Sequence, residues 1–172
     1  MLWREVLTLA SVPRNVQTPG VATRHYMPER ATLDLDVLIA AKDGPAARQR
    51  LAQTQYQYQQ ELTVGGSAWR SPDGIDVDVL ESNDSLVAQA LVEAQQNLDV
   101  QGLPILPLPY FVLMKLESGR VQDVADLARM LGQAEEDRLH EVRRVVQAHK
   151  PDPAGDLESL IQLGRMESGG QK

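Results

Sequence analysis

The sequence predicts an α+β fold in which a small mixed β-sheet is flanked by helices and is followed by C-terminal helices. Three observations predict this fold class. Apolar and polar residues alternate, as they do in strands, mainly between residues 32 and 80, whereas helical periodicity dominates from about residue 82 onward. A strong turn signal, Ser-Pro-Asp-Gly at 71–74, joins two of the strand-like stretches. The 172 residues, 42% of them hydrophobic, are enough for one compact domain with a substantial core.

The first half of the chain is predicted to hold the strands. Leu33, Leu35 and Val37 are spaced two apart, which predicts a strand over 32–40. Lys-Asp-Gly-Pro then breaks the strand, and the Ala-, Gln- and Arg-rich sequence that follows predicts a helix. The elements expected in this half are a strand at 32–40, a helix at 46–60 and strands at 62–69 and 75–80. The stretch at 12–17 has no convincing strand pattern.

The second half is predicted to be mostly helical. Ser82 or Asn83 can cap the first of these helices, because a side-chain oxygen there accepts hydrogen bonds from the N–H groups of the first turn. Helices are expected from about 83 to 98, at 110–117, 121–131 and 135–148 and from 156, with a short strand at 103–106. The buried stripe predicted for the helix at 121–131 consists of Val121, Val124, Ala125, Ala128 and Leu131.

Charge and composition argue against several classes of protein. The net charge of −7 disfavours charge-driven binding along nucleic acid, although it leaves room for a small basic nucleotide pocket. The chain has no cysteine, so it has neither disulfides nor thiolate metal sites. No apolar run approaches the roughly 20 residues that span a bilayer, and the N-terminal residues make a poor signal peptide. We therefore expect a soluble, cytoplasmic protein with no membrane partner.

Two of the strand-like stretches carry pairs of aspartates. Asp34 and Asp36 lie in RATLDLDVLI, and Asp76 and Asp78 lie in GIDVDVL. Residues two apart in a strand point to the same side, so each pair shares a face, opposite the apolar residues. Two such strands in one sheet could bring their carboxylates to a common site, where hard oxygen ligands suit Mg²⁺ or Mn²⁺. Two ions about 3.5–4 Å apart can stabilise both the attacking and the leaving oxygen in phosphoryl or nucleotidyl transfer.

The alternative is that these are ordinary half-exposed strands whose aspartates face water. Aspartate is depleted in strand interiors, so two Asp-x-Asp strands in one small domain are less expected than other polar patterns. The residues alone leave both interpretations open.

Three segments taken together resemble a known family. They are GVATRHYMPERATLDLDVLI at 20–39, GIDVDVL at 74–80 and LPYFVLMKLESGRVQDVADLARML at 108–131. In this order they are similar to the nucleotidyltransferase fold of the DNA polymerase β superfamily, and in particular to small AbiEii-like nucleotidyltransferases of bacterial toxin–antitoxin and phage-defence systems. The resemblance implies a nucleotidyltransferase-like domain over 1–132, with 133–172 as a C-terminal helical extension packed on it.

The resemblance also implies which carboxylates would bind metal. Asp34 and Asp36 would be the metal-binding pair of the catalytic site, which would hold Mg²⁺ or Mn²⁺. The third carboxylate would be Asp78, with Asp76 as the fallback.

The third segment supplies the other implied site residues. Lys115 would approach the nucleotide phosphates, a role that suits a compact ammonium charge. Asp123 or Asp126 would orient Lys115 or assist at the site. The alternative for these three residues is a solvated helix face with spaced charge pairs. Arg30 and Thr32 would support the start of the first aspartate strand.

The sequence departs from the family at the glycine motif. Nucleotidyltransferases place Gly-Gly or Gly-Ser at a helix start, where backbone N–H groups and the helix dipole hold the triphosphate. Here Pro19 precedes Gly20 and Val21, and because proline has no N–H, one phosphate donor is missing. Gly20 and Val21 would be the nucleotide-binding residues that remain. The Gly-Gly-Ser at 65–67 follows the first aspartate pair and is expected to serve a bend or bulge between strands.

The activity that the resemblance implies is metal-dependent transfer of an NMP group from an NTP to an RNA or protein acceptor. The main alternative is a catalytically impaired, partner-binding module of antitoxin type. The intact aspartates favour the enzyme, and the altered glycine motif favours the binding module. The expected partners are nucleotide, the acceptor and a cognate toxin or antitoxin protein. A homodimer whose acidic faces serve only solubility is a third interpretation.

Overall fold

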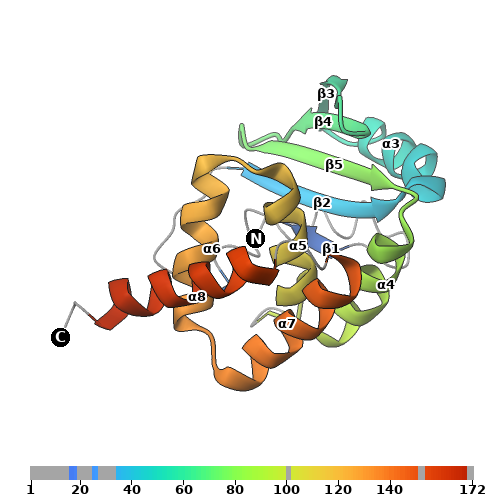
Figure 1. The fold of residues 1–172 in the computed structure, drawn as a ribbon. Helices are drawn as coiled ribbons and strands as arrows, with labels where there is room; N and C mark the ends of the chain where they lie inside the picture. Colours follow the sequence, from blue (N-terminus) through green and yellow to red (C-terminus); the bar gives the residue numbers. More distant parts are fainter. Residues whose placement is uncertain (1–15, 19–24, 27–33, 100–101, 151–153, 170–172) are drawn as a thin grey trace. The chain divides into compact units, whose positions relative to one another are not determined.

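The structure, a computed structural model, describes residues 16–18, 25–26, 34–99, 102–150 and 154–169 (Figure 1). By their contacts, these residues form two compact units. The first contains the described residues up to Leu106 except Tyr26, and the second contains Tyr26 and the described residues from Pro107 onward. These units are defined by their packing contacts. The domain boundary predicted after residue 132 rests instead on a resemblance of sequence, and it stays a prediction.

Among the described residues, the first unit is built on a five-stranded mixed sheet, which confirms the predicted α+β class. Its strands are β1 (Val16–Thr18), β2 (Asp34–Ala40), β3 (Gln57–Glu61), β4 (Gly66–Arg70) and β5 (Asp76–Ser82). The spatial order is β1-β2-β5-β4-β3, in which β2 and β5 run parallel and the other neighbours run antiparallel. Figure 1 shows β2 and β5 side by side near the middle of this sheet.

One face of the sheet forms a hydrophobic core with helix α3 (Gly44–Ala52). The core residues alternate along the strands, as the sequence predicts, because every second side chain points to the same face. The core consists of Leu35, Val37, Ile39, Ala47, Leu51, Tyr56, Trp69, Val77 and Val79. The alternate residues of β2 and β5, which include Asp36 and Asp78, therefore belong to the opposite face of the sheet.

The predicted helix at 46–60 is wrong in its second half. α3 ends at Ala52, where the Gln53 and Thr54 N–H groups bond to carbonyls three residues back and tighten the last turn. β3 follows at once, and its Tyr58 packs edge-on against Trp69 with ring centroids 5.4 Å apart. The strand predicted at 62–69 starts only at Gly66, because Leu62 and Gly66 close the turn between β3 and β4. The glycines at 65–66 thus serve a bend, as expected.

Other boundaries in the first unit also differ from the predicted ones. Helix α4 (Ser85–Glu93) is capped by Asp84, whose Oδ1 accepts from the Leu86 N–H at 2.7 Å, and not by Ser82 or Asn83. Short 3-10 turns lie at Ala41–Asp43 and Ala94–Gln96. The strand expected at 103–106 is reduced to one bridge between Leu98 and Pro104. Conversely, strand β1 covers the end of the stretch at 12–17, where the sequence showed no convincing strand pattern, and it pairs with β2.

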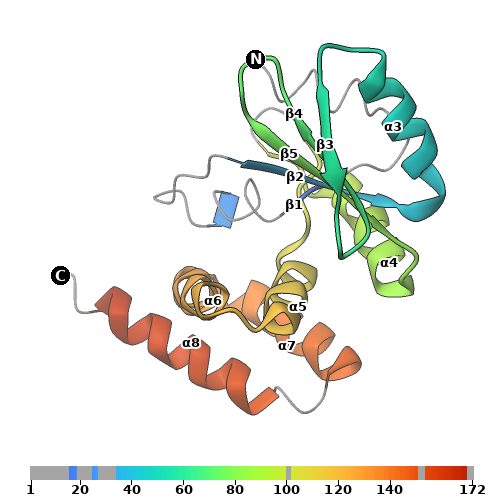
Figure 2. The same cartoon turned by 90° about the horizontal axis from the view of Figure 1, so that it is seen from above.

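From Pro107 onward, the described residues of the second unit form four helices, close to the predicted positions. They are α5 (Leu108–Ser118), α6 (Val121–Gln133), α7 (Glu136–His149) and α8 (Ala154–Gly169). Figure 2 shows α6 and α8 side by side, and their backbones touch at two glycines. A Cβ added to Gly164 would lie 1.8 Å from the Ala128 carbonyl oxygen, so only glycine fits this contact. Within the described residues, no helix is both long and apolar enough to cross a membrane.

The buried stripe predicted for α6 is wrong at its N-terminal end. Val121 is 87% exposed and Val124 is also exposed, whereas Asp126 is buried. The residues that α6 buries are Asp126, Leu127, Ala128, Met130 and Leu131. The buried face of α6 therefore includes a charged residue, Asp126, which pairs with a buried lysine from α5.

Candidate functional site

The aspartate strands β2 and β5 lie next to each other in register. Their paired positions include Asp34 with Asp76 and Asp36 with Asp78. Directly paired residues of neighbouring strands place their side chains on the same face, so Asp36 and Asp78 lie side by side on the face opposite the hydrophobic core. Both are half-buried. Two carboxylates crowded in this way repel each other, and a cation between them relieves that repulsion.

The two candidates for the third carboxylate differ in their surroundings. The side chain of Asp76 is 67% exposed, and its Oδ1 lies 3.7 Å from Nε of Arg70. Asp78 is half-buried and directly beside Asp36. Each is paired with one member of the predicted metal-binding pair, Asp76 with Asp34 and Asp78 with Asp36. Because Asp78 is less exposed and Asp76 already forms an ion pair with Arg70, Asp78 fits a shared metal site better.

The chemistry of this carboxylate pair fits Mg²⁺ or Mn²⁺, which prefer oxygen ligands. For Asp34 the structure gives only the backbone, at the start of β2. Among the described side chains, no group of three or more histidines or acidic residues is placed to hold a metal ion. Asp36 and Asp78 therefore form a two-carboxylate pair, and the part of Asp34 stays a prediction.

The predicted glycine motif begins directly after β1. The last residue of β1, Thr18, pairs with Asp36 across the sheet. Pro19, Gly20 and Val21, like Arg30 and Thr32, lie outside the described residues, and their roles stay predictions. β1 nevertheless supplies the strand before the motif that the sequence pattern failed to predict.

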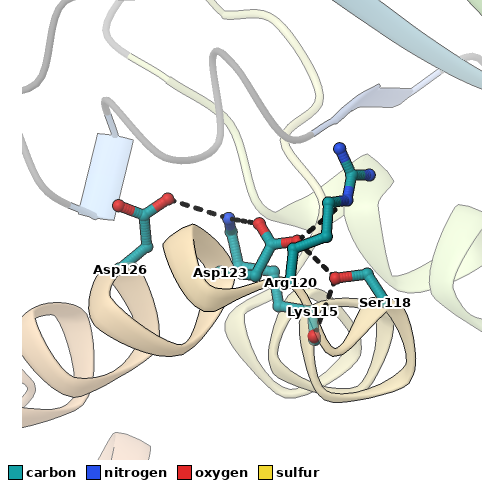
Figure 3. Close-up of polar contacts among 5 residues, drawn as sticks. All are labelled: Lys115, Ser118, Arg120, Asp123 and Asp126. Atoms are coloured by element: carbon teal, nitrogen blue, oxygen red, sulfur yellow. Dashed lines mark hydrogen bonds and ion pairs between the residues drawn. The ribbon is translucent and has the colours of Figure 1, made fainter.

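The second group of predicted residues forms a buried ion cluster between α5 and α6 (Figure 3). Nζ of Lys115 donates to Oδ1 of Asp123 at 2.5 Å and to Oδ2 of Asp126 at 3.0 Å. Lys115 is only 5% exposed and Asp126 4%. A solvated helix face is therefore the wrong interpretation of Lys115 and Asp126. Asp123 and Asp126 both fix the position of the lysine ammonium.

Asp123 joins most of the polar groups of this cluster. Its Oδ2 accepts a short hydrogen bond from the Ser118 hydroxyl and lies 3.4 Å from Nε of Arg120. Burial opposes ionisation, but the hydrogen bonds from Lys115 and Ser118 and the positive charges of Lys115 and Arg120 outweigh it. They hold the pKa of Asp123 below its usual range. The sequence motif named Lys115, Asp123 and Asp126 but did not reveal Ser118 as a partner, which only the turn between the helices brings into reach.

An aromatic ring completes the surroundings of the lysine. Nζ of Lys115 lies 5.3 Å from the ring centroid of Phe111, one turn earlier in α5. This distance is within the range of a cation–π interaction, which becomes stronger when the cation is shielded from water. Lys115 is thus held by two carboxylates and by one ring face.

Comparison with known proteins supports the fold. No protein-family model matches the sequence, and no curated protein matches it. Among solved structures, the chain is similar to the crystal structure of ANT(2")-Ia in complex with adenylyl-2"-tobramycin. The TM-score is 0.52, the sequence identity is 15%, and the match covers 97% of both chains. The fold is therefore nucleotidyltransferase-like, which confirms the resemblance at the level of fold; an AbiEii-like, toxin–antitoxin relationship stays a prediction.

Proposed function

We propose that this protein is a metal-dependent nucleotidyltransferase that moves an NMP group from an NTP to an acceptor hydroxyl. The observation that carries the proposal is the pairing of Asp36 with Asp78 across parallel strands of a nucleotidyltransferase-like fold. Asp36 and Asp78, with Asp34, would hold Mg²⁺ or Mn²⁺. The ion would supply charge neutralisation at the phosphates.

The reaction would be an in-line displacement at the α-phosphorus. The acceptor oxygen forms a bond to this phosphorus and releases its proton, while the bond to the bridging oxygen breaks and pyrophosphate leaves. Positioning and electrostatic stabilisation provide most of the catalysis in such reactions, so the fixed carboxylates of Asp36 and Asp78 suit the task. The N–H groups of Gly20 and Val21 would bind the triphosphate. The role of Lys115 in phosphate binding is also a proposal, which the resemblance supports.

The acceptor class has three candidates. The sequence resemblance favours RNA or a protein, in a toxin–antitoxin or defence setting. The bound molecule in the similar structure, adenylyl-2"-tobramycin, makes a small molecule with a free hydroxyl a third candidate. All three would present a hydroxyl to the same in-line attack.

The alternative proposal is a catalytically impaired protein that binds a partner, such as a cognate toxin or antitoxin. Pro19 favours this alternative, because the missing N–H weakens the expected binding of the triphosphate. The carboxylate pair favours the enzyme, because a binding module has no need to keep two crowded carboxylates.

Incubation of the protein with labelled NTPs and Mg²⁺ tests the proposal. Total RNA, cell-extract protein and a small-molecule fraction would be offered as acceptors in separate reactions. We expect label in one of the three, and its loss in Asp36→Asn. Asp73→Asn is the matched control, since Asp73 is exposed in the turn before β5. Transfer that survives unchanged in Asp36→Asn would refute the proposed site, and no transfer to any acceptor would favour the partner-binding alternative.

A further inference from the structure

The sheet face that carries Asp36 and Asp78 also carries an arginine. In β4, Arg70 pairs with Asp76 of β5, and Ala68 pairs with Asp78. Because paired residues share a face, Arg70 belongs to the same face as the carboxylate pair. Among the strand residues described on this face, it is the one lysine or arginine.

Arg70 is close enough to act on a molecule bound at the carboxylate pair. It is the diagonal neighbour of Asp78, and such neighbours have Cα atoms about 7–8 Å apart, within reach of long side chains. Between the two positions β4 presents only Ala68 next to Asp78. A phosphate chain that begins at Asp36 and Asp78 could therefore extend along the face toward the guanidinium.

The present contacts of Arg70 are weak ones that a ligand could replace. Its Nη2 donates to the Gly74 carbonyl oxygen at 3.3 Å, and its Nε lies 3.7 Å from Oδ1 of Asp76, beyond hydrogen-bond distance. The arginine side chain is 53% exposed, and such solvated ion pairs contribute little free energy. A phosphate offers shorter, charge-assisted bonds to the planar donors of a guanidinium.

We propose that Arg70 binds a phosphate group of the substrate, an inference that rests on the proposed nucleotidyltransferase function. A cation here offsets the loss of one backbone donor at Pro19. The phosphate belongs either to the NTP or to the backbone of a nucleic-acid acceptor. Asp76 is then a partner of the arginine and not the third metal ligand.

Calorimetric titration of the full chain with each common NTP in the presence of Mg²⁺ tests this inference. We expect Arg70→Gln to weaken NTP binding by about tenfold to a hundredfold, the effect of losing one charge-assisted hydrogen bond. Arg70→Lys should recover part of the loss, because it restores the charge but not the planar donors. The matched control is Arg50→Gln, because Arg50 is an exposed arginine on α3, which packs against the opposite face.

Two further arms separate the possible outcomes. A mixed-sequence RNA oligonucleotide identifies the source of the phosphate. If Arg70→Gln weakens RNA binding and lowers its salt dependence while NTP affinity is unchanged, the phosphate belongs to the acceptor.

Asp36→Asn identifies which proposal fails. If Asp36→Asn loses NTP binding while Arg70→Gln binds both NTP and RNA as the wild type does, the role of Arg70 is overturned. The proposed function then still stands. Absence of NTP binding in the wild-type protein overturns both.

Discussion

Lys115 is a buried cation whose charge is balanced by two carboxylates from the neighbouring helix. Nζ lies within hydrogen-bond distance of both Asp123 and Asp126, and the side chain is only 6% exposed. Breaking a buried ion pair from one side leaves the other charge uncompensated, which is why such pairs are costly to disrupt even when they contribute little net stability. At the scale of single residues, we therefore expect this cluster to be sensitive to the loss of one partner.

We expect Lys115→Met to lower the free energy of unfolding by about 3–5 kcal/mol, because it leaves Asp123 and Asp126 without their shared cation. The triple variant Lys115→Met/Asp123→Asn/Asp126→Asn should recover most of this loss, since it removes the carboxylate charges too. Urea unfolding of both variants measures the difference. A loss of about 1 kcal/mol or less in the single variant, typical of surface pairs, would contradict the buried cluster.

Pro19 permits a second test at the residue scale. If the protein is an enzyme, Pro19→Gly should tighten NTP binding by roughly tenfold to a hundredfold, because it restores one N–H donor to the triphosphate. Calorimetric titration with NTP and Mg²⁺ measures the change. If neither the wild type nor Pro19→Gly binds NTP, the partner-binding alternative gains support.

At the scale of elements, the turn between β3 and β4 places Gly66, the first residue of β4, against the backbone of β5. Gly66 has φ of 112°, and a Cβ added there would lie 1.9 Å from the Val79 carbonyl oxygen. Gly74, in the turn before β5, also has a positive φ, 79°, but an added Cβ would meet nothing within 4 Å. Alanine at Gly74 therefore tests backbone strain alone, whereas alanine at Gly66 tests backbone strain together with a steric clash.

We expect Gly74→Ala to cost about 1–3 kcal/mol of stability through backbone strain alone. Gly66→Ala should cost more, because the strand must also move away from β5. Urea unfolding of the two variants at the same protein concentration gives the comparison. Equal losses would show that β4 can shift without penalty.

The sequence predicted those elements whose apolar residues repeat regularly. β2 and β5 followed from alternation because one of their faces is buried in the core. β3 did not, since all its side chains are exposed and Gln-Tyr-Gln-Gln-Glu carries no apolar period. The buried face of α6 was predicted at Ala128 and Leu131 but missed at Asp126, because the burial of Asp126 depends on a lysine from another helix.

The candidate site was predictable only in part, for a related reason. The sequence identified Asp36 and Asp78 as carboxylates on strand faces, but only the register of β2 and β5 makes them neighbours. Arg70 lay one residue beyond the predicted strand. Its position on the same face depends on the pairing of β4 with β5, which no local pattern in the sequence reveals.

At the scale of the whole molecule, metal binding should appear as a gain in stability. A ligand that binds only the folded state stabilises it by about 2.7 kcal/mol at a hundred times its dissociation constant. For a chain of this size, that corresponds to a rise in Tm of roughly 5–10 °C. We expect Mg²⁺ or Mn²⁺ to produce such a rise in the wild type but not in Asp36→Asn, as measured by scanning calorimetry.

Without metal, Asp36→Asn should be as stable as the wild type or more so, because it relieves carboxylate repulsion. An equal rise in both proteins would place the metal elsewhere.

The parallel pairing of β2 with β5 also has a consequence for the order of folding. α3 and the hairpin of β3 and β4 lie between these strands in the sequence, so this contact joins distant parts of the chain, whereas the hairpin is local. Contacts between distant residues form slowly, because a long loop must close first. The hairpin can therefore form early, while Asp36 and Asp78 become neighbours only when the central pair of strands closes. The candidate site is then among the last features to form as the chain folds, and no intermediate that lacks this pairing can contain it.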